Sequence, residues 1–119
     1  MRVIEIEGGS GPAEALKIAE RPDPVAGPGQ VLIRVRAAGV NRPDLLQRTG
    51  AYPPPPGASD VLGLEIAGEI EAVGEGVTRW AVGDRVCALL GGGGYAELAV
   101  VDARHVLPIP EGLDYVQAA

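Results

Sequence analysis

Glycine and proline interrupt this sequence throughout, and their density is the feature that most limits its fold. The chain has 18 glycines and 11 prolines among 119 residues, spread along its whole length. Both residues mark turns and break helices, so such a chain favours short strands over long helices. We therefore predict a mostly β fold, with a single domain at residues 1–119 because this length is typical of one domain.

Alternating apolar and polar residues between these interruptions predict where the strands lie. Two such segments flank a Gly-Ser-Gly-Pro turn and indicate a hairpin. Many short strands at this spacing are typical of a barrel or a sandwich. Glycines such as Gly68 inside a strand suggest a bulge or a close approach of another backbone segment. The hairpin strands are expected at 2–8 and 14–20, further strands at 30–40, 65–74, 84–90, 95–101 and 105–110, and one or two helical turns at 44–48.

Charge and hydropathy disfavour several classes of partner. The net charge is −6 and no cluster of lysine or arginine occurs, which argues against binding to nucleic acid or to an anionic membrane surface. Cys87 is the single cysteine and permits no internal disulfide. The sequence contains no apolar run of transmembrane length and no signal-peptide core, so we expect a cytoplasmic protein without a membrane partner.

The glycine clusters do not predict a phosphate site. The segment GGGGY at 91–95 lacks the following helix, lysine and hydroxyl residue that a phosphate loop needs, so we expect a hairpin turn there. No G-x-G-x-x-G joins a strand to a helix. If a dinucleotide binds, this chain lacks the usual cradle for its pyrophosphate.

Few side chains suggest chemistry by their type alone. His105 has no histidine or cysteine at ligand spacing, and Cys87 lies within an apolar segment, so both are expected to be structural. Asp44 and Glu65 differ from the other carboxylates because each adjoins an apolar segment, where solvation is less assured. Tyr52 precedes four prolines, which fix φ and donate no backbone hydrogen bond, so it has a rigid support.

Four motifs in order resemble one known family. These are AAGVNRPDLLQRTGAYPPPP, VLGLEIAGEIEAVGEGVTRWAVGDRVCAL, GGGGYAELAVV and VLPIPEGL, which together cover nearly the whole chain. They are similar to the N-terminal part of zinc-independent quinone oxidoreductases in the medium-chain dehydrogenase/reductase superfamily. The resemblance implies a GroES-like, partly open β-barrel with short helical turns.

The resemblance also implies an activity and a missing domain. Members of this family transfer a hydride from NADPH to a quinone or a related α,β-unsaturated carbonyl, and NADPH lies mainly on a Rossmann domain that follows in sequence. That domain is absent from these residues, so we expect a fragment or one part of a split protein that is inactive alone. The parent protein is expected to be a homodimer in the cytoplasm.

Comparison with the zinc alcohol dehydrogenases implies that zinc is not a cofactor. Those relatives carry a cysteine ligand where this chain has Asn41 and a histidine ligand where it has Leu64. An amide and a leucine cannot replace a thiolate and an imidazole around zinc. The cysteine-rich lobe that holds a structural zinc is missing as well.

The resemblance implies roles for five residues. Asn41 and Asp44 would supply polar contacts beside the cofactor, with Arg42 and Leu64 as further lining. Tyr52 would orient the nicotinamide or a substrate carbonyl, or donate a proton, since a phenol keeps its proton near neutral pH. Without the resemblance, Tyr52 would be expected only to stack on Pro53 to Pro56.

A second class of function remains open at this stage. A non-enzymatic GroES-like module, either a co-chaperonin-type ring subunit or an interaction domain, would share the same barrel. Such a module has no need for a cleft that faces a nicotinamide. The NRPD turn, Tyr52 and the GLEIAG segment therefore favour the oxidoreductase.

Overall fold

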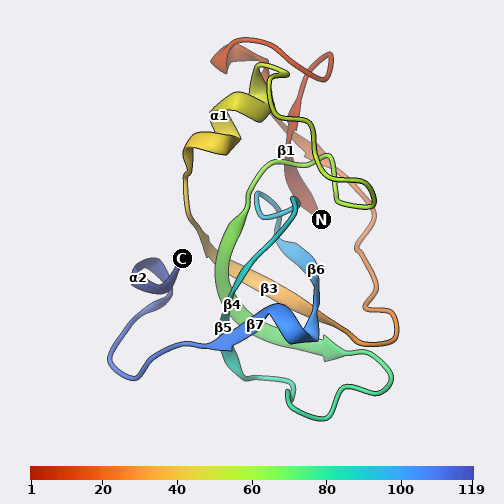
Figure 1. The fold of residues 1–119 in the computed structure, drawn as a ribbon, viewed down its shortest axis with the longest axis vertical. Helices are drawn as coiled ribbons and strands as arrows, with labels where there is room; N and C mark the ends of the chain where they lie inside the picture. Colours follow the sequence, from red (N-terminus) through yellow and green to blue (C-terminus); the bar gives the residue numbers. More distant parts are fainter.

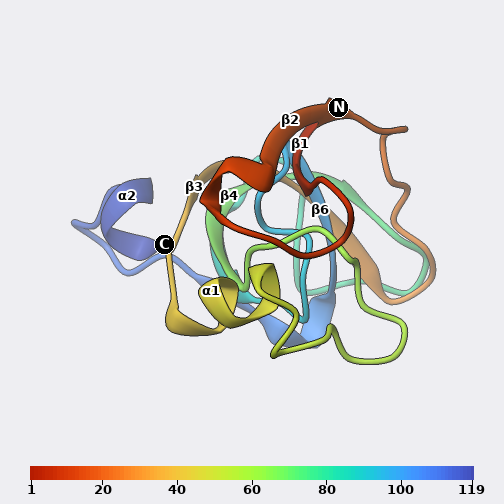
Figure 2. The same cartoon turned by 90° about the horizontal axis from the view of Figure 1, so that it is seen from above.

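The computed structural model describes residues 1–119 and consists mainly of β-strands (Figures 1 and 2). The predicted fold class, a mostly β GroES-like domain with short helical turns, is confirmed. The strands are β1 (Arg2–Ile6), β2 (Leu16–Glu20), β3 (Gln30–Ala38), β4 (Glu65–Val73), β5 (Arg85–Leu89), β6 (Leu98–Asp102) and β7 (Val106–Pro108); the helices are α1 (Arg42–Arg48), α2 (Tyr115–Ala118) and the 3-10 turns η1 (Ala13–Ala15) and η2 (Ala103–His105).

Two antiparallel sheets form the domain. β1 and β2 make the predicted hairpin, and the other strands make a five-stranded sheet in the order β6-β3-β4-β5-β7. The segment before β6 connects the sheets, because the Ile4 N–H donates to the Tyr95 carbonyl at 2.9 Å and the Glu97 N–H donates to the Arg2 carbonyl at 3.1 Å. The terminal strands β6 and β7 are not paired with each other, so the five-stranded sheet itself stays open.

The core lies against the central strands of the larger sheet. Val31 and Ile33 of β3 and Ile66 of β4 have no exposed surface, and Ile70 is 1% exposed. Full burial of such a side chain contributes roughly 1.5–3 kcal/mol. Trp80 packs against this cluster, and its indole N–H donates to the Ala103 carbonyl at 3.0 Å, so its polar atom is satisfied.

Gly68 is where the backbones of β3 and β4 come closest. A Cβ atom at this position would lie 2.1 Å from the Arg34 carbonyl oxygen. The pairing of β3 with β4 also shifts register between Leu32 and Ile33 and between Val35 and Ala37. The prediction that glycine in this strand marks a bulge or a close backbone approach is therefore confirmed.

Beyond shifts of one or two residues at strand ends, the structure differs from the sequence prediction at β6, α1 and α2. β6 begins at Leu98 because the preceding residues 95–97 bond mainly to β1, and the Glu97 carbonyl, which accepts from the Val35 N–H, makes their one bond to β3. α1 begins at Arg42, since Asn41 caps it and a proline occupies its first turn. α2 was not predicted, although Asp114 accepts from the Gln117 N–H as its N-cap. No helix in the structure has the length and apolar character that crossing a membrane requires.

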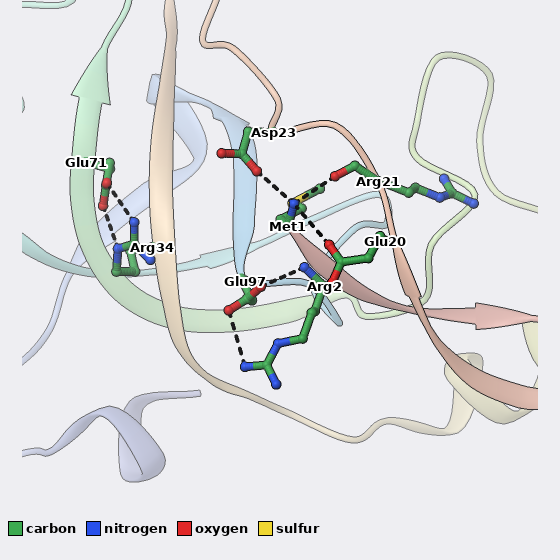
Figure 3. A network of polar contacts seen from close by, with 8 residues as sticks. All are labelled: Met1, Arg2, Glu20, Arg21, Asp23, Arg34, Glu71 and Glu97. Carbon is green, nitrogen blue, oxygen red and sulfur yellow. Dashed lines mark hydrogen bonds and ion pairs between the residues drawn. The ribbon is translucent and has the colours of Figure 1, made fainter.

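Charged pairs link neighbouring strands and segments (Figure 3). The Arg34 guanidinium of β3 meets the Glu71 carboxylate of β4, with both nitrogen-to-oxygen distances at 2.7 Å. Arg2 and Glu97 make a similar link between β1 and the segment before β6. Arg34 therefore lies on the polar face predicted for its strand, opposite the buried Ile33. Exposed pairs of this kind contribute less to stability than the core does.

Candidate functional site

The first turn of α1 holds two of the predicted site residues together. Asn41 is the N-cap of the helix, and its backbone N–H donates to Asp44 Oδ2 at 2.8 Å. An acidic residue at this position also interacts favourably with the positive end of the helix dipole. Asp44 is only 3% exposed, so its carboxylate is held inside the fold, where it supports the Asn41 backbone.

Tyr95 completes this cluster from a distant part of the chain. Its hydroxyl donates to Asp44 Oδ2 at 2.8 Å and lies 3.3 Å from the Gly39 carbonyl oxygen. Burial, together with the hydrogen bond to Asp44, raises the pKa of the Tyr95 phenol. The hydroxyl therefore stays protonated and fixes the carboxylate that supports Asn41.

Glu65 connects the same cluster to the first residue of β4. The Asn41 side-chain amide donates to Glu65 Oε2 at 3.1 Å. Leu64 precedes Glu65 and is half-buried, and its carbonyl accepts from the Leu90 N–H at 2.8 Å. Arg42 is exposed at the start of α1 and makes no hydrogen bond or ion pair. Asn41 thus bonds to both Asp44 and Glu65. The Arg42 side chain takes no part in this cluster.

Two exposed apolar side chains adjoin this polar cluster, one in sequence and one in strand register. Val40 is 78% exposed immediately before Asn41. Leu89 is 69% exposed and is the register partner of Glu65 across β4 and β5. Large apolar side chains gathered around a polar centre are typical of a surface that contacts a ligand or another domain.

Tyr52 lies in a different setting from the Asn41 cluster. It is 39% exposed, its hydroxyl has no hydrogen-bond partner, and it lines a cavity of about 250 Å³ between the β1–β2 hairpin and the proline segment. Arg21 joins two acidic residues in the lining of this cavity. Its Nε donates to Glu5 at 2.6 Å and its Nη1 donates to Asp60 at 2.7 Å. The guanidinium lowers the pKa of the Asp60 carboxyl. Tyr52 thus lies beside Pro53 and Pro54 in this cavity, and its hydroxyl is free to bond to another molecule.

Three backbone N–H groups of the glycine cluster at 91–95 are engaged within the fold. The N–H groups of Gly93, Gly94 and Tyr95 donate to the carbonyls of residues 61, 63 and 62 at 2.8–2.9 Å. A Cβ atom at Gly92 would lie 2.4 Å from the Ser59 carbonyl oxygen, so glycine is needed for close packing. The segment packs on residues 59–63 rather than forming the simple hairpin turn that we predicted.

The donors at the positions of the zinc ligands in related dehydrogenases do not suit a metal. The Asn41 amide is engaged with Glu65, and Leu64 offers no donor atom. Cys87 lies half-buried within β5, where burial raises the pKa of its thiol, and His105 is exposed at the end of η2. No three histidine, cysteine or acidic side chains are grouped to hold a metal ion.

Sequence reasoning did not identify Tyr95 or Gly39. Tyr95 is 51 residues from the carboxylate that it contacts, and the sequence places it only at the junction of a glycine turn and a predicted strand. Gly39 leaves space for Glu65, since a Cβ atom there would lie 2.7 Å from Glu65 Oε2. A glycine and an asparagine flanking one apolar residue after a strand are the only local signal for this arrangement.

Comparison with known proteins gives one family. The model of the alcohol dehydrogenase GroES-like domain matches residues 27–111. The quinone oxidoreductase of Pseudomonas aeruginosa is 43% identical over 117 residues, which are 98% of this chain and 35% of that protein. The resemblance inferred from the four motifs is confirmed.

Solved structures agree with this assignment. The human synaptic vesicle membrane protein VAT-1 homolog-like protein superimposes with a TM-score of 0.91 at 32% identity, covering 100% of this chain and 38% of that one. Escherichia coli quinone oxidoreductase complexed with NADPH superimposes with a TM-score of 0.89 at 29% identity, covering 99% of this chain and 36% of that one. This chain spans about a third of the length of these proteins.

Proposed function

This chain belongs to the alcohol dehydrogenase GroES-like domain family, and we propose that it forms the catalytic-domain portion of an NADPH-dependent oxidoreductase. The proposed reaction is hydride transfer from NADPH to a quinone or a related α,β-unsaturated carbonyl. The quinone oxidoreductase names of the P. aeruginosa and E. coli proteins, one of them complexed with NADPH, support this assignment. Such a cofactor supplies the hydride when bound, while the protein supplies position and electrostatics.

The carrying observation is the cluster at the start of α1. The Asn41 side-chain amide donates to the Glu65 carboxylate and the Asn41 backbone N–H donates to the Asp44 carboxylate, so both parts of Asn41 are held. The exposed Val40 and Leu89 beside it offer apolar contact to a flat ring. These residues suit the nicotinamide end of the cofactor, with Arg42 and Leu64 as further lining and Tyr52 as the proposed proton or hydrogen-bond donor.

The pyrophosphate end of NADPH requires a different part of the protein. α1 has seven residues and α2 has four, and neither follows a glycine-rich turn from a strand. We therefore propose that a Rossmann domain outside residues 1–119 binds the rest of the cofactor. The homodimeric state and the cytoplasmic location of the complete protein are proposed from the resemblance alone.

A two-part assay tests this function. The isolated chain should bind NADPH weakly in a fluorescence titration and should not reduce a quinone. A chimaera, in which this chain replaces the matching segment of the P. aeruginosa quinone oxidoreductase, should recover NADPH-dependent quinone reduction. Tight NADPH binding or steady turnover by the chain alone would contradict the two-domain assignment. A folded chimaera that binds NADPH without turnover would instead favour a non-enzymatic GroES-like module.

Metal analysis tests the proposed independence from zinc. We expect the purified chimaera to contain substoichiometric metal by elemental analysis, because an amide and a leucine occupy the positions of two zinc ligands. Activity should survive incubation with a chelator, and a mock-treated sample is the control. Stoichiometric zinc whose removal abolishes turnover would refute the proposal.

A further inference from the structure

We propose that Glu65 is a positioning residue, which holds the Asn41 amide so that one of its N–H groups is available to a carbonyl oxygen of the bound ligand. This inference rests on the proposed function, because it concerns the same cluster at the start of α1. Nothing in the four sequence motifs assigns a role to Glu65, although its position beside an apolar segment is unusual for a carboxylate.

The contact itself fixes which end of the amide faces Glu65. A carboxylate only accepts hydrogen bonds, so the group at 3.1 Å from Glu65 Oε2 must be the Asn41 NH2. That nitrogen carries two N–H groups, and it makes no other hydrogen bond in the structure. One N–H is thus occupied by Glu65 and one remains for a ligand.

Gly39 provides the space that this arrangement needs. A Cβ atom on Gly39 would lie 2.7 Å from Glu65 Oε2 and 3.4 Å from Asn41 Nδ2. The pair therefore packs directly on the Gly39 backbone, whose N–H also donates to the Glu65 carbonyl at 2.9 Å. Any larger residue at this position would push the Glu65 carboxylate away from the amide.

The backbone of Asn41 is held as firmly as its side chain. Asp44 Oδ2 accepts from the Asn41 N–H and from the Tyr95 hydroxyl, each at 2.8 Å. With the backbone and one side-chain N–H both engaged, the amide has little freedom to rotate. A bound molecule then meets a preorganised donor, which lowers the entropic cost of forming the hydrogen bond.

Charge restricts the ligand group that can use this donor. A carboxylate or phosphate at the amide would also approach Glu65, and like charges repel at this distance. A neutral carbonyl oxygen meets the donor without that cost. Two sources of such an oxygen fit the proposed reaction: the carboxamide of the nicotinamide, and the carbonyl of the quinone or enone.

Nuclear magnetic resonance of the ¹⁵N-labelled chain tests the positioning. Asn41 is the only asparagine, so its side-chain NH2 signals are readily identified. We expect one of the two protons to be shifted and protected from exchange by Glu65, and we expect this signature to disappear in Glu65→Ala and in Gly39→Ala. Glu69→Ala is the control, because Glu69 lies on the same strand and pairs with Arg36 instead.

Titrations on the same samples test the ligand contact and separate its two sources. One arm uses NADPH, and the other uses a tetrasubstituted benzoquinone, which leaves no ring position open to addition by Cys87. The ligand whose carbonyl accepts from Asn41 should shift the signal of the remaining Asn41 N–H. The dissociation constant of that ligand should rise by about 3–10-fold in Glu65→Ala and Gly39→Ala but not in Glu69→Ala.

The outcomes distinguish this inference from the proposed function. An Asn41 signal that is the same in wild type and Glu65→Ala, with all variants folded by their thermal midpoints, overturns the positioning role. Shifts elsewhere in the domain that leave Asn41 unaffected overturn the ligand contact while preserving the proposed function. No response to either ligand, combined with an inactive chimaera, would remove the proposed function itself.

Discussion

Replacing Gly68 with alanine should lower the free energy of unfolding by about 3 kcal/mol or more, at the upper end of what overpacking costs. The added Cβ would lie 2.1 Å from the Arg34 carbonyl oxygen and 2.9 Å from the Ile33 side chain. The first neighbour is backbone in the central pair of the sheet and cannot rotate away. Separating β3 from β4 would also expose the core residues between them. Chemical denaturation followed by the fluorescence of Trp80, the only tryptophan, measures the loss.

Gly27→Ala is the matched control for this prediction. Its φ is not in the left-handed region, and the nearest atom to the added Cβ is Gln30 Oε1 at 3.2 Å, which belongs to a flexible side chain. We expect its unfolding free energy to change by about 1 kcal/mol or less. If the two variants unfold at the same denaturant concentration, the backbone approach at Gly68 does not destabilise the alanine variant, and the prediction is wrong.

Much of this fold, including the close approach at Gly68, could be predicted from local features of the sequence. Strand positions depend on local alternation and on nearby turn residues, and both are visible within a few residues. The hairpin of β1 and β2 and the alternation of β3 were predicted in this way. The start of β6 was not, because residues 95–97 bond mainly to β1, a strand more than ninety residues away in sequence.

The candidate site likewise combines contacts that are local in the sequence with contacts that depend on the tertiary fold. Asn41 and Asp44 are three residues apart on one helical turn, so their association is a local property of the sequence. Tyr95 and Glu65 reach the same cluster only because the sheet folds them there. The burial of Asp44 likewise depends on tertiary packing, and it changes the interpretation of that residue from a direct contact to a support for Asn41.

Two features of Tyr52 bear on its proposed role. Its ring lines a cavity beside Pro53 and Pro54, which is the arrangement expected for packing alone. Its hydroxyl has no partner within the domain, which is the arrangement expected for a group that bonds to a ligand. The ion pairs of Arg21 with Glu5 and Asp60 line the same cavity in either case.

Tyr52→Phe in the chimaera separates the alternatives because it removes one oxygen and keeps the ring. If the hydroxyl donates a proton to the reacting carbonyl, kcat/KM should fall by as much as roughly 10²–10⁴-fold, and by less if it only positions the substrate. The thermal midpoint should stay unchanged, because the hydroxyl makes no hydrogen bond that the variant would break. Tyr115→Phe is the control, since Tyr115 lies on α2 with its ring against Arg85.

The choice of substrate decides how much this experiment can reveal. A quinone that has accepted a hydride can take its proton from water, so its reduction can be insensitive to Tyr52 even when the hydroxyl is well placed. An enone depends more strongly on a positioned acid, because protonation of the enolate that hydride transfer leaves is harder to bypass. We therefore expect a larger loss for the enone than for the quinone. Equal rates for wild type and Tyr52→Phe on both substrates, with stability unchanged, would show that the tyrosine supports only the proline segment.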